Sequence, residues 1–399
     1  MSFRARLCLV LLFVVVVGLA WLVRTPSGPV KPTGLAPLAS GWQVETVVAG
    51  LAHPWAVVWL PTGEALITEK AGRLRVVRDG RLREEPVAGL PDLLGRGHGG
   101  LMDLALHPRF AENRLVYFTF GGGTPEANST RLARGRLSDD ASRLTDVTVL
   151  HTVSPLKAGL QHFGSRLLWL PDGTLLLAVG DGGNPPNQVD GQLAREQAQR
   201  LDSQLGKVLR LREDGSVPTD NPFVGRAGAD PHLWTYGHRN IQGLARDPAS
   251  GRIWANEHGS RGGDELNLLS PGRNYGWPRA TYSIEYTFGT ISRHTHLPGM
   301  EDPQVVWTPA QAPSGLLFYT GTEFPGWQGD LFSGALKRKE VRRIDLDADG
   351  RVLRQESIPI GARVRDVRQG PDGALYVLTD EPAGRLLRLS SRSATGSGS

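Results

Sequence analysis

The sequence has 399 residues, and 40% of them are apolar, which is enough for one large globular domain or two ordinary ones. It contains 50 Gly and 28 Pro without a G-X-Y period, a composition that excludes a collagen-like chain, predicts many turns and disfavours long helices. The net charge is +5, but the basic residues are spread singly, so we expect no nucleic-acid partner.

An apolar run occupies residues 7–23 and is flanked by arginines. A basic start followed by an apolar stretch predicts that residues 1–24 are an export signal; an uncleaved membrane anchor is the alternative, because about 17 to 20 apolar residues span a bilayer. Both interpretations place the body in the periplasm or outside the cell, with the N-terminal segment as its membrane contact. The single cysteine, Cys8, lies in this run, so we expect neither disulfides nor thiolate chemistry in the body.

Two segments of biased composition flank the body. Residues 25–41 are rich in Pro, Gly and Ser, which predicts a linker, and residues 390–399 predict a disordered tail. The body itself, residues 42–389, repeats one pattern: an apolar strand, a turn built on Pro, Asp or Gly, and a second apolar strand. The instances lie at residues 56–68, 104–120, 166–180, 243–256, 316–336 and 367–379.

Repeats of this kind are typical of a β-propeller, whose blades are small antiparallel sheets arranged in a ring. We therefore predict an all-β fold, a six-bladed β-propeller with four-stranded antiparallel blades. Residues 195–207 are the best helix candidate and are expected to form a surface insertion. Loops at one end of such blades converge on the central channel, so functional side chains are expected there.

The third repeat carries a candidate catalytic pair. His162 precedes the hairpin at residues 166–180 and Asp181 follows it, so folding the hairpin returns both residues to one edge of the sheet. A histidine accepts a proton near neutral pH, and a carboxylate on its other nitrogen fixes the tautomer and stabilises the imidazolium. Spacing alone leaves a structural role for His162 as the alternative.

Two later loops offer further polar groups. The stretch TYGHRNIQGL places Arg239, Asn240 and Gln242 just ahead of a strand. The glycine-rich stretch that follows it combines Asp264 and Glu265 with exposed carbonyls. Ligand sets made only of oxygen atoms suit hard cations such as Ca²⁺.

Basic residues follow in the last two repeats. Lys337 lies in GALKRK, and Arg363 and Arg365 lie in ARVRDV. Residues two apart in a strand point to the same face, so the two guanidinium groups are placed to hold one polyanion. A solvated basic edge is the alternative.

Two other motifs carry less weight. Residues 95–100 match G-x-G-x-x-G but lack the strand and helix that a dinucleotide site requires. The run from Asp345 to Gly350, with Glu356 after it, matches the EF-hand calcium-loop pattern, yet its flanks resemble strands rather than helices. We expect a polar hairpin turn there, with calcium binding left open.

Five motifs occur in a fixed order: QHFGSRL with GDGG downstream, YGHRNIQGL, EHGSRGGDELN followed by NYGWP, ALKR, and RVRDV. In this order they resemble the soluble sugar dehydrogenases that use pyrroloquinoline quinone (PQQ), also called glucose/sorbosone or aldose dehydrogenases. The resemblance extends from about residue 42 to residue 389. It implies a six-bladed propeller, in agreement with the repeats.

The resemblance also implies an activity, that of a quinoprotein oxidoreductase which oxidises the C1 hydroxyl of aldose sugars to the lactone. His162 would take the proton of the anomeric hydroxyl while hydride leaves for the quinone, and Asp181 would orient His162. Arg239 would polarise the quinone oxygen that receives charge, a role suited to a fixed guanidinium. The other cofactor contacts that it implies are Asn240, Gln242, Lys337, Arg363 and Arg365.

Calcium is the second implied cofactor. The backbone carbonyls of Gly259 and Ser260 would bind a Ca²⁺ ion that also contacts the quinone. A second, structural Ca²⁺ would use Asp264 and the backbone at Glu265 and Tyr275. An ortho-quinone accepts hydride best when a cation withdraws its electron density, so calcium suits the implied chemistry.

Three positions depart from the family pattern. Gln161 stands where glucose-oxidising members have an Asp beside the catalytic His, His98 stands where a Gln near the sugar is expected, and Ser260 replaces a Pro. The sugar and the electron acceptor therefore stay open, and we expect a monomer or a homodimer. Two alternative functions are a calcium-dependent lactonase on the same fold and a non-catalytic propeller that binds carbohydrate or a partner.

Overall fold

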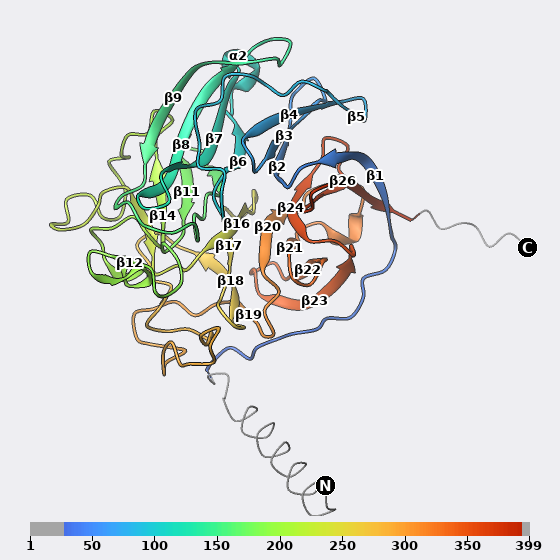
Figure 1. The fold of residues 1–399 in the computed structure, drawn as a ribbon. Coiled ribbons are helices and arrows are strands. Elements are labelled where there is room, and N and C mark those ends of the chain that lie inside the picture. Colours follow the sequence, from blue (N-terminus) through green and yellow to red (C-terminus); the bar gives the residue numbers. More distant parts are fainter. Residues whose placement is uncertain (1–27, 393–399) are drawn as a thin grey trace, which may run out of the picture.

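The computed structural model describes residues 28–392 (Figure 1). The expected signal or anchor at residues 1–24 lies outside these residues, as does the part of the expected tail from residue 393 onward. The tail was predicted to begin at residue 390, but Ser390 and Ser391 are the last residues of a strand and pair with Gln43 and Trp42. Within the described range, no helix is long and apolar enough to cross a membrane.

Six four-stranded antiparallel sheets stand in a ring, which confirms the predicted six-bladed β-propeller (Figure 1). The first strand of each blade packs against the first strand of the next blade and so lines the centre of the ring. Blade 1 consists of β2 (Pro54–Trp59), β3 (Ala65–Glu69), β4 (Arg73–Arg78) and β5 (Arg81–Leu82). Blade 2 consists of β6 (Leu101–Leu106), β7 (Leu115–Gly123), β8 (Asn128–Leu137) and β9 (Leu144–Thr152). Blade 3 consists of β10 (Leu167–Trp169), β11 (Leu175–Val179), β14 (Lys207–Leu211) and β15 (Leu233–Tyr236).

The second half of the ring follows the same plan. Blade 4 consists of β16 (Ile241–Arg246), β17 (Ile253–Glu257), β18 (Asp264–Leu269) and β19 (Val305–Trp307). Blade 5 consists of β20 (Pro313–Phe318), β21 (Leu331–Ala335), β22 (Glu340–Leu346) and β23 (Val352–Pro359). Blade 6 consists of β24 (Val364–Gln369), β25 (Leu375–Thr379), β26 (Gly384–Ser391) and β1 (Trp42–Leu51). A small hairpin, β12 (Gln188–Val189) and β13 (Gln192–Leu193), and the short helices α2 (Phe110–Asn113), η1 (Ala194–Gln199) and η2 (Pro325–Trp327) complete the described elements.

The two ends of the described chain close the ring together. Strand β1, from the start of the body, pairs antiparallel with β26 and forms the outer edge of blade 6. The last blade therefore needs a strand from the first part of the chain. This closure covers the edge of β26, which would otherwise expose unpaired backbone groups.

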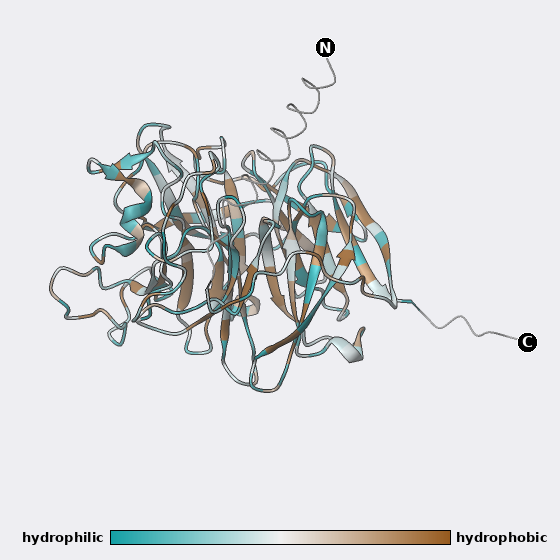
Figure 2. Cartoon of the chain, turned by 90° about the horizontal axis from the view of Figure 1, so that it is seen from below, coloured by the Kyte–Doolittle hydropathy of each residue, from teal (hydrophilic) through white to brown (hydrophobic). Residues whose placement is uncertain are grey.

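The repeated hairpins recognised in the sequence form the first two strands of the six blades. In blade 3, Leu167 pairs with Leu177 and Trp169 with Leu175. Strand β11 is buried along its whole length because sheet neighbours cover both of its edges and other blades cover both of its faces. Figure 2 shows the apolar strands packed through the middle of the molecule and the hydrophilic segments at its periphery.

The helix predicted at residues 195–207 is wrong in kind and in length. The structure has only the short 3-10 helix η1 there, and Lys207 already begins β14. The reason lies in the Lys207 ammonium, which is buried and donates to the carbonyl oxygens of Gln197 (2.8 Å), Ala198 (3.0 Å) and Leu205 (2.7 Å). A continuing α-helix would have used the first two of these carbonyls for its own ladder.

The segment before β1 runs along the outside of blades 4 and 5 (Figure 1). Thr33 pairs with Trp307 of β19, and Leu38 pairs with Ser357 of β23. The backbone N–H of Thr33 donates to the Val306 carbonyl at 2.8 Å. This part of the expected linker is thus hydrogen-bonded to two blades before the chain enters the sixth.

A buried ion cluster lies where the first strands of several blades meet. Arg166 donates to Asp103 on β6 at 2.9 Å and lies 3.2 Å from Asp366 on β24. Arg368 contacts Asp366 at 2.8 Å and Asp103 at 3.1 Å. Two guanidinium groups therefore meet two carboxylates, which compensates charge that would be costly to bury alone. The Arg166 guanidinium also lies 4.4 Å from the ring centre of Trp55, so the cluster packs against that ring.

Candidate active site

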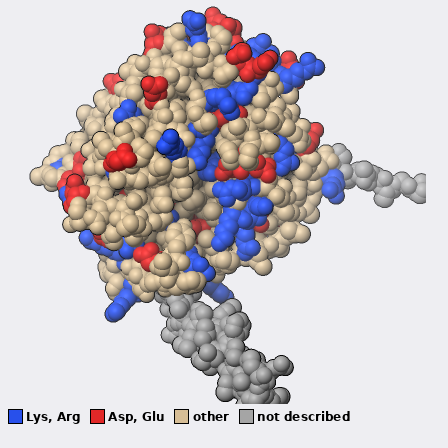
Figure 3. Space-filling model, in the orientation of Figure 1, with Lys and Arg blue, Asp and Glu red and all other residues tan. Residues whose placement is uncertain are grey.

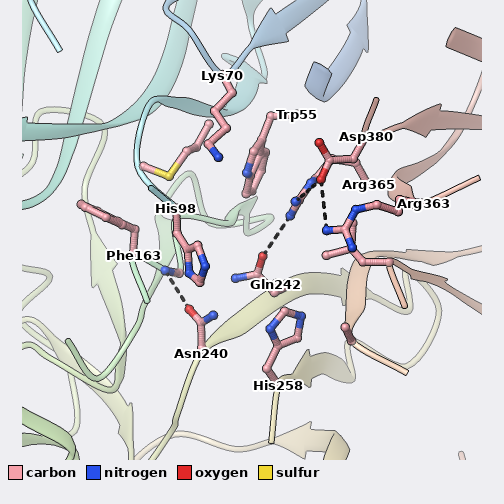
Figure 4. Close-up of a pocket in the computed structure, with 14 residues that line it drawn as sticks. Trp55, Lys70, His98, Phe163, Asn240, Gln242, His258, Arg363, Arg365 and Asp380 are labelled. Carbon is pink, nitrogen blue, oxygen red and sulfur yellow. Dashed lines mark hydrogen bonds and ion pairs between the residues drawn. The ribbon is translucent and has the colours of Figure 1, made fainter. Parts of the chain in front are cut away.

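A cavity of about 220 Å³ opens close to the centre of the ring. Its lining comes from loops and strand ends of every blade from the first to the sixth, as expected for a propeller channel. Of the residues selected from the sequence, His98, Asn240, Gln242, Arg363 and Arg365 line it (Figure 4). The other lining residues are Trp55, Lys70, Met102, Phe163, Gly164, His258, Ala312, Leu336 and Asp380.

One side of this cavity is positively charged. Arg365 contacts the Asp380 carboxylate at 2.7 Å and Arg363 contacts it at 3.4 Å, so the two guanidinium groups share one counter-ion (Figure 4). Within residues 28–392, the Lys70 ammonium has neither a hydrogen bond nor an ion pair. Figure 3, a view from the same side as Figure 1, shows Lys and Arg side chains gathered near the middle of the molecular surface. The excess of cations over carboxylates suits an anionic ligand.

The pKa values of these groups follow from that surplus. Burial would raise the pKa of Asp380, but Arg365 and His53 outweigh it and hold that pKa far below its usual range. Burial and then the positive charge of Arg365 lower the pKa of Lys70. Both shifts reflect a site in which positive charges outnumber carboxylates.

The candidate catalytic pair comes together as the sequence predicted. His162 Nδ1 lies 2.6 Å from Asp181 Oδ1, and both side chains are buried. Asp181 also accepts hydrogen bonds from Trp277 Nε1 at 2.7 Å and from the Gly183 N–H at 3.0 Å. A carboxylate can only accept hydrogen bonds, and these donors hold it in place. It therefore selects the His162 tautomer that carries its proton on Nδ1, which leaves Nε2 as the basic atom.

Electrostatics set the charge state of this pair. Burial and then Arg239 lower the pKa of His162, against the opposing effect of Asp181. Burial raises the pKa of Asp181, but His162 and Arg239 outweigh this effect and lower it overall. At neutral pH the pair is therefore a neutral imidazole beside a carboxylate, which is the state that a general base requires.

His98 stands between this pair and the cavity. Its ring stacks on that of His162 with 6.2 Å between the ring centroids and 25° between the planes. Its loop, residues 95–100, leads directly into β6 without a helix. Gly100 has a φ of 127°, and a Cβ there would lie 2.1 Å from the Lys70 carbonyl oxygen, so only glycine lets this loop approach Lys70.

Arg239 is buried, and its guanidinium lacks a carboxylate partner within the described chain. Its two terminal nitrogens donate to the His258 carbonyl at 3.0 Å and to Asn184 Oδ1 at 2.7 Å. Its Nε is buried without a partner, and the guanidinium carbon lies 5.3 Å from the ring centre of Trp277. A fixed cation without a counter-ion is a strong electrostatic element in a site that excludes water.

The residues expected to bind calcium lie around β17 and β18. Asp264 accepts hydrogen bonds from the backbone N–H groups of Gly259 (2.8 Å), Gln311 (2.6 Å) and Ala312 (2.7 Å). Burial raises the pKa of Asp264 to about 6, although these bonds oppose the shift. The Ser260 N–H donates to Ser283 Oγ at 3.1 Å.

A second, very small cavity lies beside these loops, and Glu257, Gly259 and Glu265 help to line it together with Arg239. Glu257 and Glu265 are paired residues on β17 and β18. Burial and then Glu257 raise the pKa of Glu265 well above its usual value. Two adjacent carboxyl groups, one buried and one half-buried, are costly, and a cation between them would relieve that cost. Among residues 28–392 there is no group of three or more His, Cys, Asp or Glu side chains placed to hold a metal ion. A bound Ca²⁺ would therefore also need backbone oxygens.

Three selected residues lie away from the cavity. Lys337 is exposed, and its backbone N–H donates to the Gln311 carbonyl at 3.0 Å. Tyr275 is buried with its ring stacked on His238, and its hydroxyl donates to the Leu268 carbonyl at 2.9 Å. Gln161 Oε1 accepts hydrogen bonds from Asn184.

The stretch with the EF-hand pattern is a hairpin turn between β22 and β23, as expected. Asp345 is paired with Arg354 at 2.7 Å and Glu356 with Arg343 at 2.5 Å. These carboxylates are therefore directed at arginines on the strands.

Sequence reasoning missed several residues of the site, among them Lys70, Asp380, His258, Asn184 and Trp277. Asp181 lies two residues after the second strand of the third repeat, and Lys70 directly follows the second strand of the first. Asp380 follows the second strand of the sixth repeat in the same way. Comparing equivalent positions across the repeats would have found both.

Comparison with known proteins agrees with this geometry. Residues 51–388 match the family model described as glucose/sorbosone dehydrogenase. An uncharacterized protein of Synechocystis is 54% identical over 354 residues, 86% of this chain and 85% of the relative. The aldose sugar dehydrogenase YliI of Escherichia coli is 42% identical over 359 residues, 88% of this chain and 93% of the relative. The PQQ-bound aldose sugar dehydrogenase of Streptomyces coelicolor superposes with a TM-score of 0.71 at 26% identity, and the match covers 89% of this chain and 100% of that one.

Proposed function

The chain belongs to the glucose/sorbosone dehydrogenase family, and on that premise we propose that it is a PQQ-dependent dehydrogenase that oxidises the C1 hydroxyl of aldose sugars to the lactone. One observation carries the proposal. The buried His162–Asp181 pair lies behind His98 at a cavity whose opposite side is cationic. A neutral base next to an anion-binding cavity fits proton removal from a sugar that is oxidised beside an anionic acceptor.

The residues present fit PQQ. Its carboxylates suit the unpaired Lys70 and the pair Arg363 and Arg365, which share a single counter-ion. Its flat ring system suits the apolar surfaces of Trp55 and Phe163. When bound, PQQ would supply an ortho-quinone that accepts the electron pair of the sugar C1–H bond as hydride.

The protein's own residues would supply the proton transfer. Oxidation to the lactone removes a hydride from C1 and a proton from its hydroxyl, and we assign that proton to His162 Nε2. Asp181 would stabilise the imidazolium through its 2.6 Å contact with Nδ1, and Trp277 would hold Asp181 in place. Arg239 would place a positive charge next to the acceptor oxygen.

Calcium is part of the proposal. The carbonyls of Gly259 and Ser260 would hold the ion that touches the cofactor, and Asp264 with the backbone at Glu265 and Tyr275 would hold a second ion. The adjacent carboxyl groups of buried Glu257 and half-buried Glu265 support a cation in this region. We also propose that the protein is exported, because of its apolar N-terminal run.

The test is reconstitution of the purified protein with PQQ and Ca²⁺, followed by dye reduction on addition of an aldose from a broad panel. We expect dye reduction and bleaching of the oxidised cofactor's absorbance. PQQ binding without turnover of any sugar would support a binding propeller instead. Hydrolysis of a lactone without dye reduction would support a lactonase.

A further inference from the structure

We infer that Asn184 is a positioning residue that fixes the guanidinium of Arg239, and that Gln161 holds Asn184 in the orientation needed for this. The inference rests on the proposed function and deepens it. It assigns a role to Asn184, and it explains why the position next to the base carries Gln161 rather than a carboxylate.

The argument begins with what holds Arg239. Only 2% of the residue is exposed, and its guanidinium makes two side-chain hydrogen bonds within the described chain. One goes to a backbone carbonyl, that of His258, and the other to Asn184 Oδ1 at 2.7 Å. Both acceptors are neutral, so they fix the direction of the cation without cancelling its charge. Asn184 is the only side chain in the described structure that accepts a hydrogen bond from it.

The orientation of Asn184 follows from donor and acceptor chemistry. A guanidinium has only donors, so the oxygen of the Asn184 amide must face Arg239 and its nitrogen must face away. On the far side, Gln161 Oε1 accepts from Asn184 Nδ2 at 3.2 Å and from the Asn184 backbone N–H at 3.1 Å. One oxygen thus fixes both the side chain and the backbone of Asn184.

Two short segments therefore hold both functional groups. Gln161 and His162 are consecutive, and Asp181 and Asn184 lie on one loop after β11. His162 is held by Asp181, and Arg239 is held by Asn184, whose own partner is Gln161. The loop between them passes through Gly183, which has a φ of 126°; a Cβ there would lie 2.6 Å from Asn187 Nδ2 and 3.3 Å from Gln161 Oε1, so the position favours glycine. The proposed base and the proposed electrophile are thereby fixed relative to each other.

The charge of residue 161 matters in this arrangement. An ionised carboxylate there would accept from Asn184 equally well, but it would place a negative charge near both Arg239 and His162. It would weaken the electrostatic effect of Arg239 and raise the pKa of His162. Glutamine provides the acceptor oxygen without that charge.

The experiment compares Asn184→Ala with Asn187→Ala as a matched control. Asn187 lies on the same loop and is also half-buried, but within the described residues it makes no hydrogen bond to Arg239. For Asn184→Ala we expect kcat to fall about tenfold or more with a smaller change in the sugar KM, because a displaced charged donor loses part of its transition-state stabilisation. We expect the control to keep kcat within about twofold. Equal kcat values for the two variants would overturn the inference.

Two measurements separate positioning from loss of structure. Asn184→Asp keeps an acceptor oxygen for Arg239 but adds a negative charge, so we expect a lower reduction potential of the bound cofactor with a smaller loss of kcat than in Asn184→Ala. A crystal structure of cofactor-free Asn184→Ala is expected to show the guanidinium displaced from the His258 carbonyl. An unmoved guanidinium would overturn the inference even if the wild-type protein failed to bind PQQ, whereas that failure would refute only the proposed function.

The role of Gln161 is tested by a double-mutant cycle. If Gln161 acts through Asn184, Gln161→Ala lowers kcat on its own but adds no further loss to Asn184→Ala. Losses that multiply would show that Gln161 acts separately, for instance on the sugar, and would overturn this part of the inference.

Discussion

Replacing Asp181 with Asn tests how the catalytic pair works. All three partners of the Asp181 carboxylate donate to it: His162 Nδ1, the Gly183 N–H and Trp277 Nε1. An amide has one oxygen and one NH₂ group, so it cannot accept from all three. Either its NH₂ faces Trp277, where two donors oppose each other, or it faces His162.

The two orientations have different costs. In the first, the Trp277 N–H is left buried and unpaired, which costs about 1–3 kcal/mol of stability. In the second, the NH₂ group forces the His162 proton onto Nε2, and the basic atom that should face the sugar is lost. A positioned general base contributes about 100-fold to 10⁴-fold, so we expect kcat of Asp181→Asn to fall by at least about 100-fold.

The assay is steady-state dye reduction by the reconstituted protein as a function of pH. Activity requires neutral His162, and burial and Arg239 lower its pKa below 6.5. The wild-type rate should therefore fall at a lower pH than it would with an ordinary histidine as the base. Trp277→Phe is the control, because it removes one donor to Asp181 and leaves the His162 contact intact. If Asp181→Asn kept kcat within tenfold of the wild type, the assignment of the tautomer to Asp181 would be refuted.

Three further predictions follow from the same contacts. His162→Ala should abolish turnover, with a loss of at least about 100-fold, while PQQ affinity measured by tryptophan quenching changes little; turnover within tenfold of the wild type would contradict proton transfer by this residue. Lys70→Met should weaken PQQ binding about tenfold or more, because a charge-assisted contact is lost, and Lys337→Met should weaken it less because that side chain is exposed. Asp366→Ala should lower the free energy of unfolding in urea by about 3–5 kcal/mol, because it leaves Asp103 as the one carboxylate of the cluster for both arginines, whereas Asp345→Ala, which removes an exposed pair, should cost about 0–1 kcal/mol. A similar cost for the two aspartates would show that the central cluster is not held by charge.

The parts of the molecule that depend on local sequence were predictable. Each repeated hairpin is contained within about 20 residues, and its apolar strands and turn residues specify it without help from the rest of the chain. The meeting of His162 and Asp181 follows from one such hairpin, so it was predicted from spacing. The pairing of Arg363 and Arg365 on one side of a cavity follows from strand alternation.

Features that depend on contacts between blades were not predictable in this way. Lys70 and Asp380 are separated by most of the chain, and they share a cavity only because blades 1 and 6 are neighbours in the ring. The helix predicted at residues 195–207 failed because Lys207 takes the carbonyls that a helix would need. The direction of the Gln161 side chain could not be predicted from the sequence either, since it depends on a hydrogen bond to a loop 23 residues away.

Ring closure and ligand binding are linked by the position of the cationic side of the cavity. Lys70 belongs to blade 1, and Arg363, Arg365 and Asp380 belong to blade 6, whose outer strand is β1. The cationic groups therefore face one cavity only when β1 has paired with β26 and the first and last blades are in contact. Their mutual repulsion opposes this closure in the absence of an anion, and an anionic ligand removes that repulsion. A ligand that binds only the closed ring stabilises it by about 2.7 kcal/mol when present at 100 times its Kd. The same strand pairing that completes the fold thus also creates the charge surplus that we propose recognises the cofactor.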